Sequence, residues 1–191
     1  RETANMIFDP ARFDFQVIDS PTQLQDLLAE KNKKANRARV VAGYCWDWRS
    51  KKNPDVYDIV IPEYGYERQW NLDKDGSLWL IAPQSIDEVG CIHTCQGLEL
   101  DYVGVIVGPD LLARDGLLVT DPMGRSSQDR SIRGWKTLMK SDPEETFKRV
   151  DKIIRNTYRT LMTRGMKGCY VYCTDSETRD YFRTRLTVPT I

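Results

Sequence analysis

The sequence has a single histidine, His93, and no long apolar run. No stretch of its 191 residues approaches the roughly 18 consecutive apolar residues of a membrane-spanning helix. The formal net charge is zero, so no strong overall field attracts nucleic acid, and any such binding must come from local clusters. No secretory signal is recognisable, and Arg1 to Thr3 resemble the interior of a longer protein. We therefore expect a cytoplasmic fragment that does not bind membranes.

The number of cysteines is odd, which argues against a disulfide framework. They are Cys45, Cys91, Cys95, Cys169 and Cys173. Two pairs have three intervening residues, and His93 lies inside the first pair, so zinc has to be considered. Zinc ligands within one turn usually have two intervening residues. The segment 169–173 also has the composition of a buried strand, so we favour structural cysteines over a metal site.

A phosphate-binding loop of the pattern Gly-x-x-x-x-Gly-Lys-Ser/Thr is also missing. No strand is followed by a convincing acidic pair that would hold Mg²⁺. We therefore expect the isolated chain to be inactive in ATP hydrolysis and to contain no cofactor of its own.

Hydrophobic patterning predicts an α/β fold with a mainly parallel sheet flanked by helices. Strands are expected at 13–18, 39–44, 57–61, 103–107 and 169–173, and helices at 22–35, from Pro143 to about Thr163 and from 176 to about 186. Asp142 is a predicted N-cap, and Phe147, Val150 and Ile154 belong to a predicted buried stripe.

Two stretches interrupt this pattern. Residues 50–82 read as a β-rich elaboration, including a short β piece at 77–81. Residues 113–134 are polar and rich in glycine, which predicts a long mobile loop. The whole of 1–191 is expected to form one domain.

A first dense motif runs from His93 to Glu99 and precedes a hydrophobic strand. Gly97 permits close backbone approach, Gln96 both donates and accepts hydrogen bonds, and Glu99 suits a ribose hydroxyl. Taken alone, the pattern also fits a polar turn with a satisfied histidine.

A second motif, Leu161 to Gly168, places Arg164 between a helix end and a strand. A guanidinium in such a position can stabilise a phosphoryl group during transfer. An arginine that caps its own helix or pairs with a carboxylate is an equal alternative.

Together, and in this order, the two motifs resemble motifs V and VI of superfamily 1 helicases. The segment His93 to Glu99 matches His-x-x-Gln/Lys-Gly-x-Glu, and Leu161 to Arg164 matches the Leu-Thr-Arg signature. Over residues 36–186 the chain more closely resembles an uncharacterised family of predicted ATPases related to schlafen-type helicases. The pieces that carry this resemblance lie at 42–48, 69–71, 101–106 and 155–158.

The resemblance implies a P-loop NTPase (RecA-like) second domain, the C-terminal half of an ATP-dependent translocase or helicase. Arg164 would be the arginine finger and Glu99 would approach the ribose, while Gln96 and Gly97 would couple the nucleotide to the nucleic acid. ATP and Mg²⁺ would bind in the full-length protein, where an upstream RecA-like domain supplies the missing loop.

The same resemblance places His93 and Thr94 near the phosphates of bound DNA or RNA. Trp46 and Trp48 could stack on a base, although edge tryptophans often only pack. Two departures affect these contacts: Cys91 stands where the helicases usually have threonine, and the aromatic residue of motif VI shifts to Tyr158.

Two other functions remain open. The chain could be a nucleic-acid-binding or regulatory module of the same fold without ATPase activity. It could also be an unrelated α/β enzyme that uses His93 as base and Cys95 as nucleophile, although no oxyanion site is evident.

Overall fold

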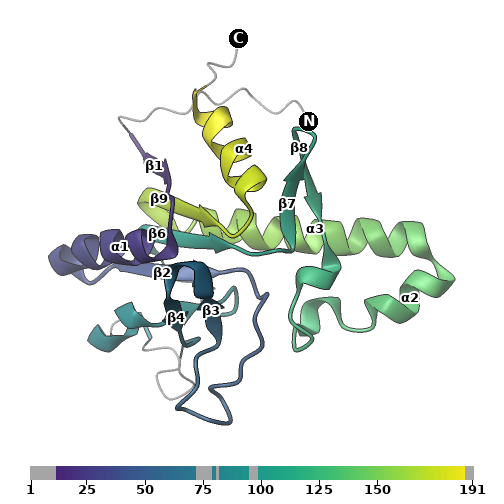
Figure 1. Cartoon of the computed structure of the whole chain (residues 1–191), viewed down its shortest axis with the longest axis horizontal. Helices are drawn as coiled ribbons and strands as arrows, with labels where there is room; N and C mark the ends of the chain where they lie inside the picture. Colours follow the sequence, from purple (N-terminus) through teal and green to yellow (C-terminus); the bar gives the residue numbers. More distant parts are fainter. Residues whose placement is uncertain (1–11, 72–78, 81, 95–98, 188–191) are drawn as a thin grey trace.

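Five parallel strands form the central sheet of the computed structural model (Figure 1). The structure describes residues 12–71, 79–80, 82–94 and 99–187. The strands lie in the order β1-β9-β6-β2-β5, and every neighbouring pair is parallel. Their bounds are β1 Asp14–Val17, β2 Ala38–Ala42, β5 Val89–Gly90, β6 Leu100–Val107 and β9 Gly165–Cys173. The predicted α/β fold with a parallel sheet is confirmed.

Both faces of the sheet are covered. Alternate side chains of β6 point to opposite faces, so Val105 packs in one core with Ile154 of α3 (Pro143–Met162), while Ile106 packs in the other with Leu24 of α1 (Pro21–Ala35). Helix α4 (Ser176–Thr187) packs on β7, β9 and β1 and adds Phe182 to the α3 core. The sheet therefore lies between two apolar layers.

Helix α3 begins as its sequence predicts. The Asp142 carboxylate accepts the Glu145 backbone N–H at 3.3 Å, and Pro143 occupies the first turn. Val150 and Ile154 are buried, but Phe147 is 48% exposed, so its predicted place in the buried stripe is wrong. The reason is that the first turns of α3 extend beyond the sheet toward α2 (Figure 1).

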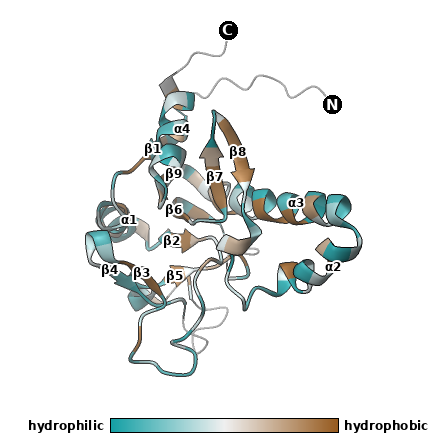
Figure 2. Cartoon of the chain, turned by 45° about the vertical axis from the view of Figure 1, so that its right-hand side comes forward, coloured by the Kyte–Doolittle hydropathy of each residue, from teal (hydrophilic) through white to brown (hydrophobic). Residues whose placement is uncertain are grey.

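The stretch predicted as a long loop is largely structured, which corrects that expectation. Strands β7 (Leu111–Arg114) and β8 (Leu117–Thr120) form an antiparallel hairpin whose hydrophobic residues are visible in Figure 2. At its tip Asp115 and Gly116 have φ angles of 52° and 73°. Positive φ at both central residues is the requirement of a two-residue hairpin turn. Two 3₁₀ turns, η4 (Pro122–Gly124) and η5 (Arg130–Ile132), and helix α2 (Trp135–Ser141) follow.

A second antiparallel hairpin lies within 50–82. It consists of β3 (Ile59–Ile61) and β4 (Tyr66–Arg68), joined by η1 (Pro62–Tyr64), and it packs in the α1 core. Trp70 makes an isolated parallel bridge to Val89, while Trp79 and Leu80 lie in a turn rather than a strand. A 3₁₀ helix, η3 (Pro83–Asp87), leads into β5.

Candidate functional site

Arg164 and Glu99 lie side by side at the amino ends of β9 and β6. The Leu100 backbone N–H donates to the Arg164 carbonyl at 3.0 Å, and Leu100 is paired with Gly165 in the sheet. Arg37, just before β2, donates from Nη2 to the Glu99 carbonyl at 3.2 Å. Parallel pairing thus gathers three strand starts, and the charged residues before them, at one edge.

The Arg164 side chain is half-buried and lies back on its own helix. Its Nε donates to the Thr160 carbonyl at 3.3 Å, which is the helix-capping arrangement considered above as the alternative. Within the described part of the chain, Nη1 and Nη2 have no hydrogen-bond partner. The guanidinium therefore has its outer fork available for an anion.

Asp101 is the acidic residue of this edge that is already engaged. Its carboxylate lies 2.7 Å from Lys167 Nζ and 3.7 Å from Arg37 Nε. The hydrogen bond from Lys167 lowers the pKa of the Asp101 carboxyl below its usual value. Glu99 is exposed and stands beside it, which makes Glu99 the acid available to a ligand.

His93 and Thr94 follow β5. Thr94 Oγ1 donates to Asn71 Oδ1 at 2.6 Å, and His93 is exposed. The hydroxyl proton of Thr94 is therefore already used inside the protein, whereas His93 faces solvent. Cys95, Gln96 and Gly97 lie outside the described residues.

Trp46 and Trp48 lie at the opposite, carboxyl edge of the sheet, in the loop after β2. Both are half-buried against the α1 core. The Trp46 carbonyl accepts Trp70 Nε1–H at 3.2 Å, and the Trp48 N–H donates to Gln128 Oε1 at 2.9 Å. The structure therefore separates the tryptophans from Arg164 and Glu99 instead of joining all predicted residues in one site.

Sequence reasoning missed a buried polar cluster at this carboxyl edge. The Tyr158 hydroxyl donates to Asp110 and accepts the Gly108 N–H at 2.9 Å. Arg125 Nε lies 2.7 Å from the second Asp110 oxygen, and its Nη1 lies 2.6 Å from Asp129. Burial raises the pKa of the Tyr158 hydroxyl well above its usual value, so it keeps its proton.

One guanidinium, that of Arg125, lies between two carboxylates in this cluster. Burial disfavours the charged form of Arg125, but the two carboxylates Asp110 and Asp129 hold its guanidinium pKa above the ordinary value. Gly43 lets Tyr158 enter, because a Cβ there would stand 2.0 Å from the hydroxyl oxygen. The cluster ties α3 to the loops that follow β2 and β6.

Comparison with known proteins gives the family. The profile described as "Schlafen group 3, DNA/RNA helicase domain" matches residues 1–175. The chain belongs to this helicase-domain family. The expected kinship with schlafen-type helicases is confirmed.

The chain is also similar to a yeast protein. The chain is 29% identical over 175 residues to the uncharacterized protein YPL245W of Saccharomyces cerevisiae, a match over 88% of this chain and 36% of that protein. The schlafen-type domain thus spans about a third of the relative it matches. No solved structure matches the chain.

Two further features of this schlafen-type helicase domain concern ligands. The described residues include no group of three or more His, Cys, Asp or Glu side chains placed to hold a metal ion. Among the helices of the described ranges, none has the length and apolarity required to cross a membrane.

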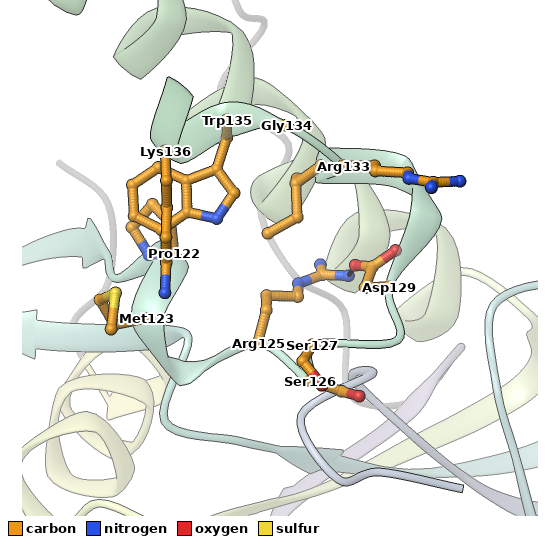
Figure 3. A pocket seen from close by; sticks show the side chains of 11 residues that line it. Pro122, Met123, Arg125, Ser126, Ser127, Asp129, Arg133, Gly134, Trp135 and Lys136 are labelled. Carbon is orange, nitrogen blue, oxygen red and sulfur yellow. Dashed lines mark hydrogen bonds and ion pairs between the residues drawn. The ribbon is translucent and has the colours of Figure 1, made fainter. Parts of the chain in front are cut away.

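The domain also has a cavity of about 440 Å³ beyond the carboxyl edge (Figure 3). It lies among η4, η5 and the start of α2, in the stretch that the sequence predicted to be a loop. Trp135, Pro122 and Met123 gather on one side of it, and Arg125 and Asp129 on another. In the sequence, the adjacent Trp135 and Lys136 were the residues that could have drawn attention to this cavity.

Proposed function

We propose that this chain is the C-terminal, second RecA-like half of an ATP-dependent nucleic-acid translocase or helicase. Its ATP site lies between this domain and an upstream RecA-like domain of the same protein that carries the phosphate-binding loop. The observation that carries the proposal is the meeting of Arg164 and Glu99, which are distant in sequence, across the Leu100-to-Arg164 backbone hydrogen bond.

The chemistry of the two side chains fits this role. Glu99 is exposed and accepts hydrogen bonds, as ribose hydroxyls require. The Arg164 bond to Thr160 uses only Nε, so the outer fork can reach a γ-phosphate while the helix end holds the side chain. ATP supplies the phosphoryl group when bound, and Mg²⁺ would be held chiefly by the upstream domain.

The test is ATP hydrolysis by the full-length protein with and without single-stranded DNA or RNA. Arg164→Ala is expected to lower nucleic-acid-stimulated kcat by at least about 100-fold, because a finger arginine contributes on the order of 10³-fold or more. Nucleotide affinity should change only a few-fold. Arg164→Lys should restore little, because an ammonium lacks the planar fork.

Arg149→Ala is the matched control, since Arg149 is an exposed arginine of helix α3, the helix that ends just before Arg164. Turnover in Arg164→Ala equal to that of this control would reject the finger role.

A binding or regulatory module without ATPase activity is the second candidate. It is favoured by the capping bond of Arg164 to Thr160 and by the missing phosphate-binding loop. Nucleic-acid affinity in a full-length protein that does not hydrolyse ATP would select this alternative.

A further inference from the structure

The cavity at residues 122–136 has the size and lining of a ligand site. Its volume of about 440 Å³ falls within the range of small-molecule pockets. Trp135 is half-buried against the α3 core and still lines the cavity, so its ring is held in place. Ser126 and Ser127 add hydroxyl groups to the lining. A fixed aromatic wall beside small polar groups suits a planar heteroaromatic ring.

The floor of the cavity is formed by buried, ion-paired side chains. Arg125 pairs with Asp110 and Asp129, and its Nη2 donates to Thr157 Oγ1 at 3.0 Å. Arg125 and Asp129 therefore shape the cavity without offering a charge to a ligand.

The rim carries the uncompensated charge. Arg133 and Lys136 are exposed, and within the described ranges neither has a carboxylate at ion-pair distance. Lys136 Nζ lies 5.8 Å from the centre of the Trp135 ring, and Arg133 projects outward from the opposite side of the rim (Figure 3). A cation over an aromatic wall matches the phosphate and base of one nucleotide.

The cavity is continuous with the loop that carries Trp46 and Trp48. The Ser126 N–H donates to the Tyr44 carbonyl at 3.0 Å, and the Ser126 hydroxyl donates to Asp47. Gln128 accepts the Trp48 N–H at 2.9 Å. These hydrogen bonds join the two loops at the carboxyl edge.

We propose that the 122–136 cavity binds one unstacked nucleotide of a single-stranded nucleic acid. The base lies against Trp135, and the adjoining phosphates lie at Lys136 and Arg133. A base in a duplex must first be unpaired and unstacked, which costs free energy, and a single strand avoids most of this cost. This inference rests on the proposed function insofar as the domain handles nucleic acid.

The test is binding of a dye-labelled single-stranded oligonucleotide to the full-length protein, with cross-linking of a 4-thiouridine-containing strand and peptide mapping. Trp135→Ala is expected to weaken binding about tenfold, and Trp135→Phe to restore most of it. Lys136→Glu, a surface change that should not disturb folding, should also weaken binding. Lys136→Ala should lower the slope of log affinity against log salt by about one.

Lys140→Ala is the matched control on the same helix and should leave affinity and slope unchanged. The cross-link should map to the peptide that contains Trp135. Binding that is unaffected by Trp135→Ala, Lys136→Glu and Lys136→Ala, with cross-links elsewhere, would overturn the cavity assignment and leave the proposed function standing. No affinity of the wild-type protein for any strand would overturn both.

A competition experiment with a free nucleotide distinguishes a site for a nucleotide within a strand from a site for a free nucleotide. AMP at millimolar concentration should displace the strand only weakly. If Trp135→Ala weakens the binding of AMP but leaves the affinity for the oligonucleotide unchanged, the cavity binds a free nucleotide, and the assignment to a single strand is overturned.

Discussion

The Tyr158 hydroxyl donates to the buried carboxylate of Asp110, and this bond joins helix α3 to the loop after β6. The same oxygen accepts the Gly108 N–H. One phenol therefore satisfies two buried groups.

Removing this hydroxyl should lower stability. Tyr158→Phe leaves the Gly108 N–H and one Asp110 oxygen without their partner, which costs about 1–3 kcal/mol of unfolding free energy. Urea denaturation measures the loss. Tyr57→Phe, at a tyrosine that is 48% exposed, is the control and should change little. Equal stability of the two variants would show that the cluster does not depend on the hydroxyl.

Breaking the buried ion pairs should cost more. Arg125→Ala leaves Asp110 and Asp129 facing each other without a cation, and removing one partner from a buried pair costs about 3–5 kcal/mol. Thermal unfolding followed by circular dichroism measures this effect. Arg130→Ala, at an exposed arginine nearby, should remain close to wild type. A loss below about 1 kcal/mol would mean that water reaches the cluster.

The start of α4 should give a pH-dependent contribution to stability. The hydrogen bond from Arg114 lowers the pKa of Asp175 to about 2, and Asp175 also accepts the Thr178 N–H at 2.8 Å. Because the folded pKa is depressed, this stabilisation is complete above about pH 4 and disappears as the pH falls through about 2.

Asp175→Ala should therefore lower unfolding free energy by about 1 kcal/mol at pH 7 and by less near pH 2. Chemical denaturation at the two pH values measures this difference. A deficit that is the same at both values would exclude titration of this carboxylate as the cause.

Local patterns predicted the elements whose signals are local. The cap at Asp142 and the apolar stripe were sufficient to predict helix α3 and its buried face. Phe147 is the exception, because periodicity does not reveal where a helix extends beyond the sheet. The β7–β8 hairpin was not predicted, although Asp115-Gly116 between two leucine-containing segments is a strong hairpin signal. The polar composition of 113–134 is typical of a loop, but the turn residues at 115–116 determine the local structure.

Long-range order was beyond local reasoning. The predicted β-α-β start holds as elements, but β9 and β6 lie between β1 and β2 in the sheet. The residues of the Tyr158 cluster come from four segments of the chain. No motif in any of these segments indicates which other segment it contacts. The resemblance predicts Arg164 and Glu99 as nucleotide-binding residues, and the strand order places both at the amino edge of the sheet. The position of Trp46 and Trp48 at the other edge also follows only from the strand order.

Tyr158 precedes Arg164 by less than two helical turns, about 9 Å of axial rise. The last turns of α3 therefore connect the loops of the carboxyl edge, which contact Tyr158, to the candidate arginine finger at Arg164. If a bound γ-phosphate displaced Arg164, these turns of the helix would transmit the displacement to the loops of the carboxyl edge. Nucleic acid bound at those loops would in turn shift the position of Arg164, and the coupling free energy would be the same in both directions. The same helical segment would then respond both to ATP and to nucleic acid.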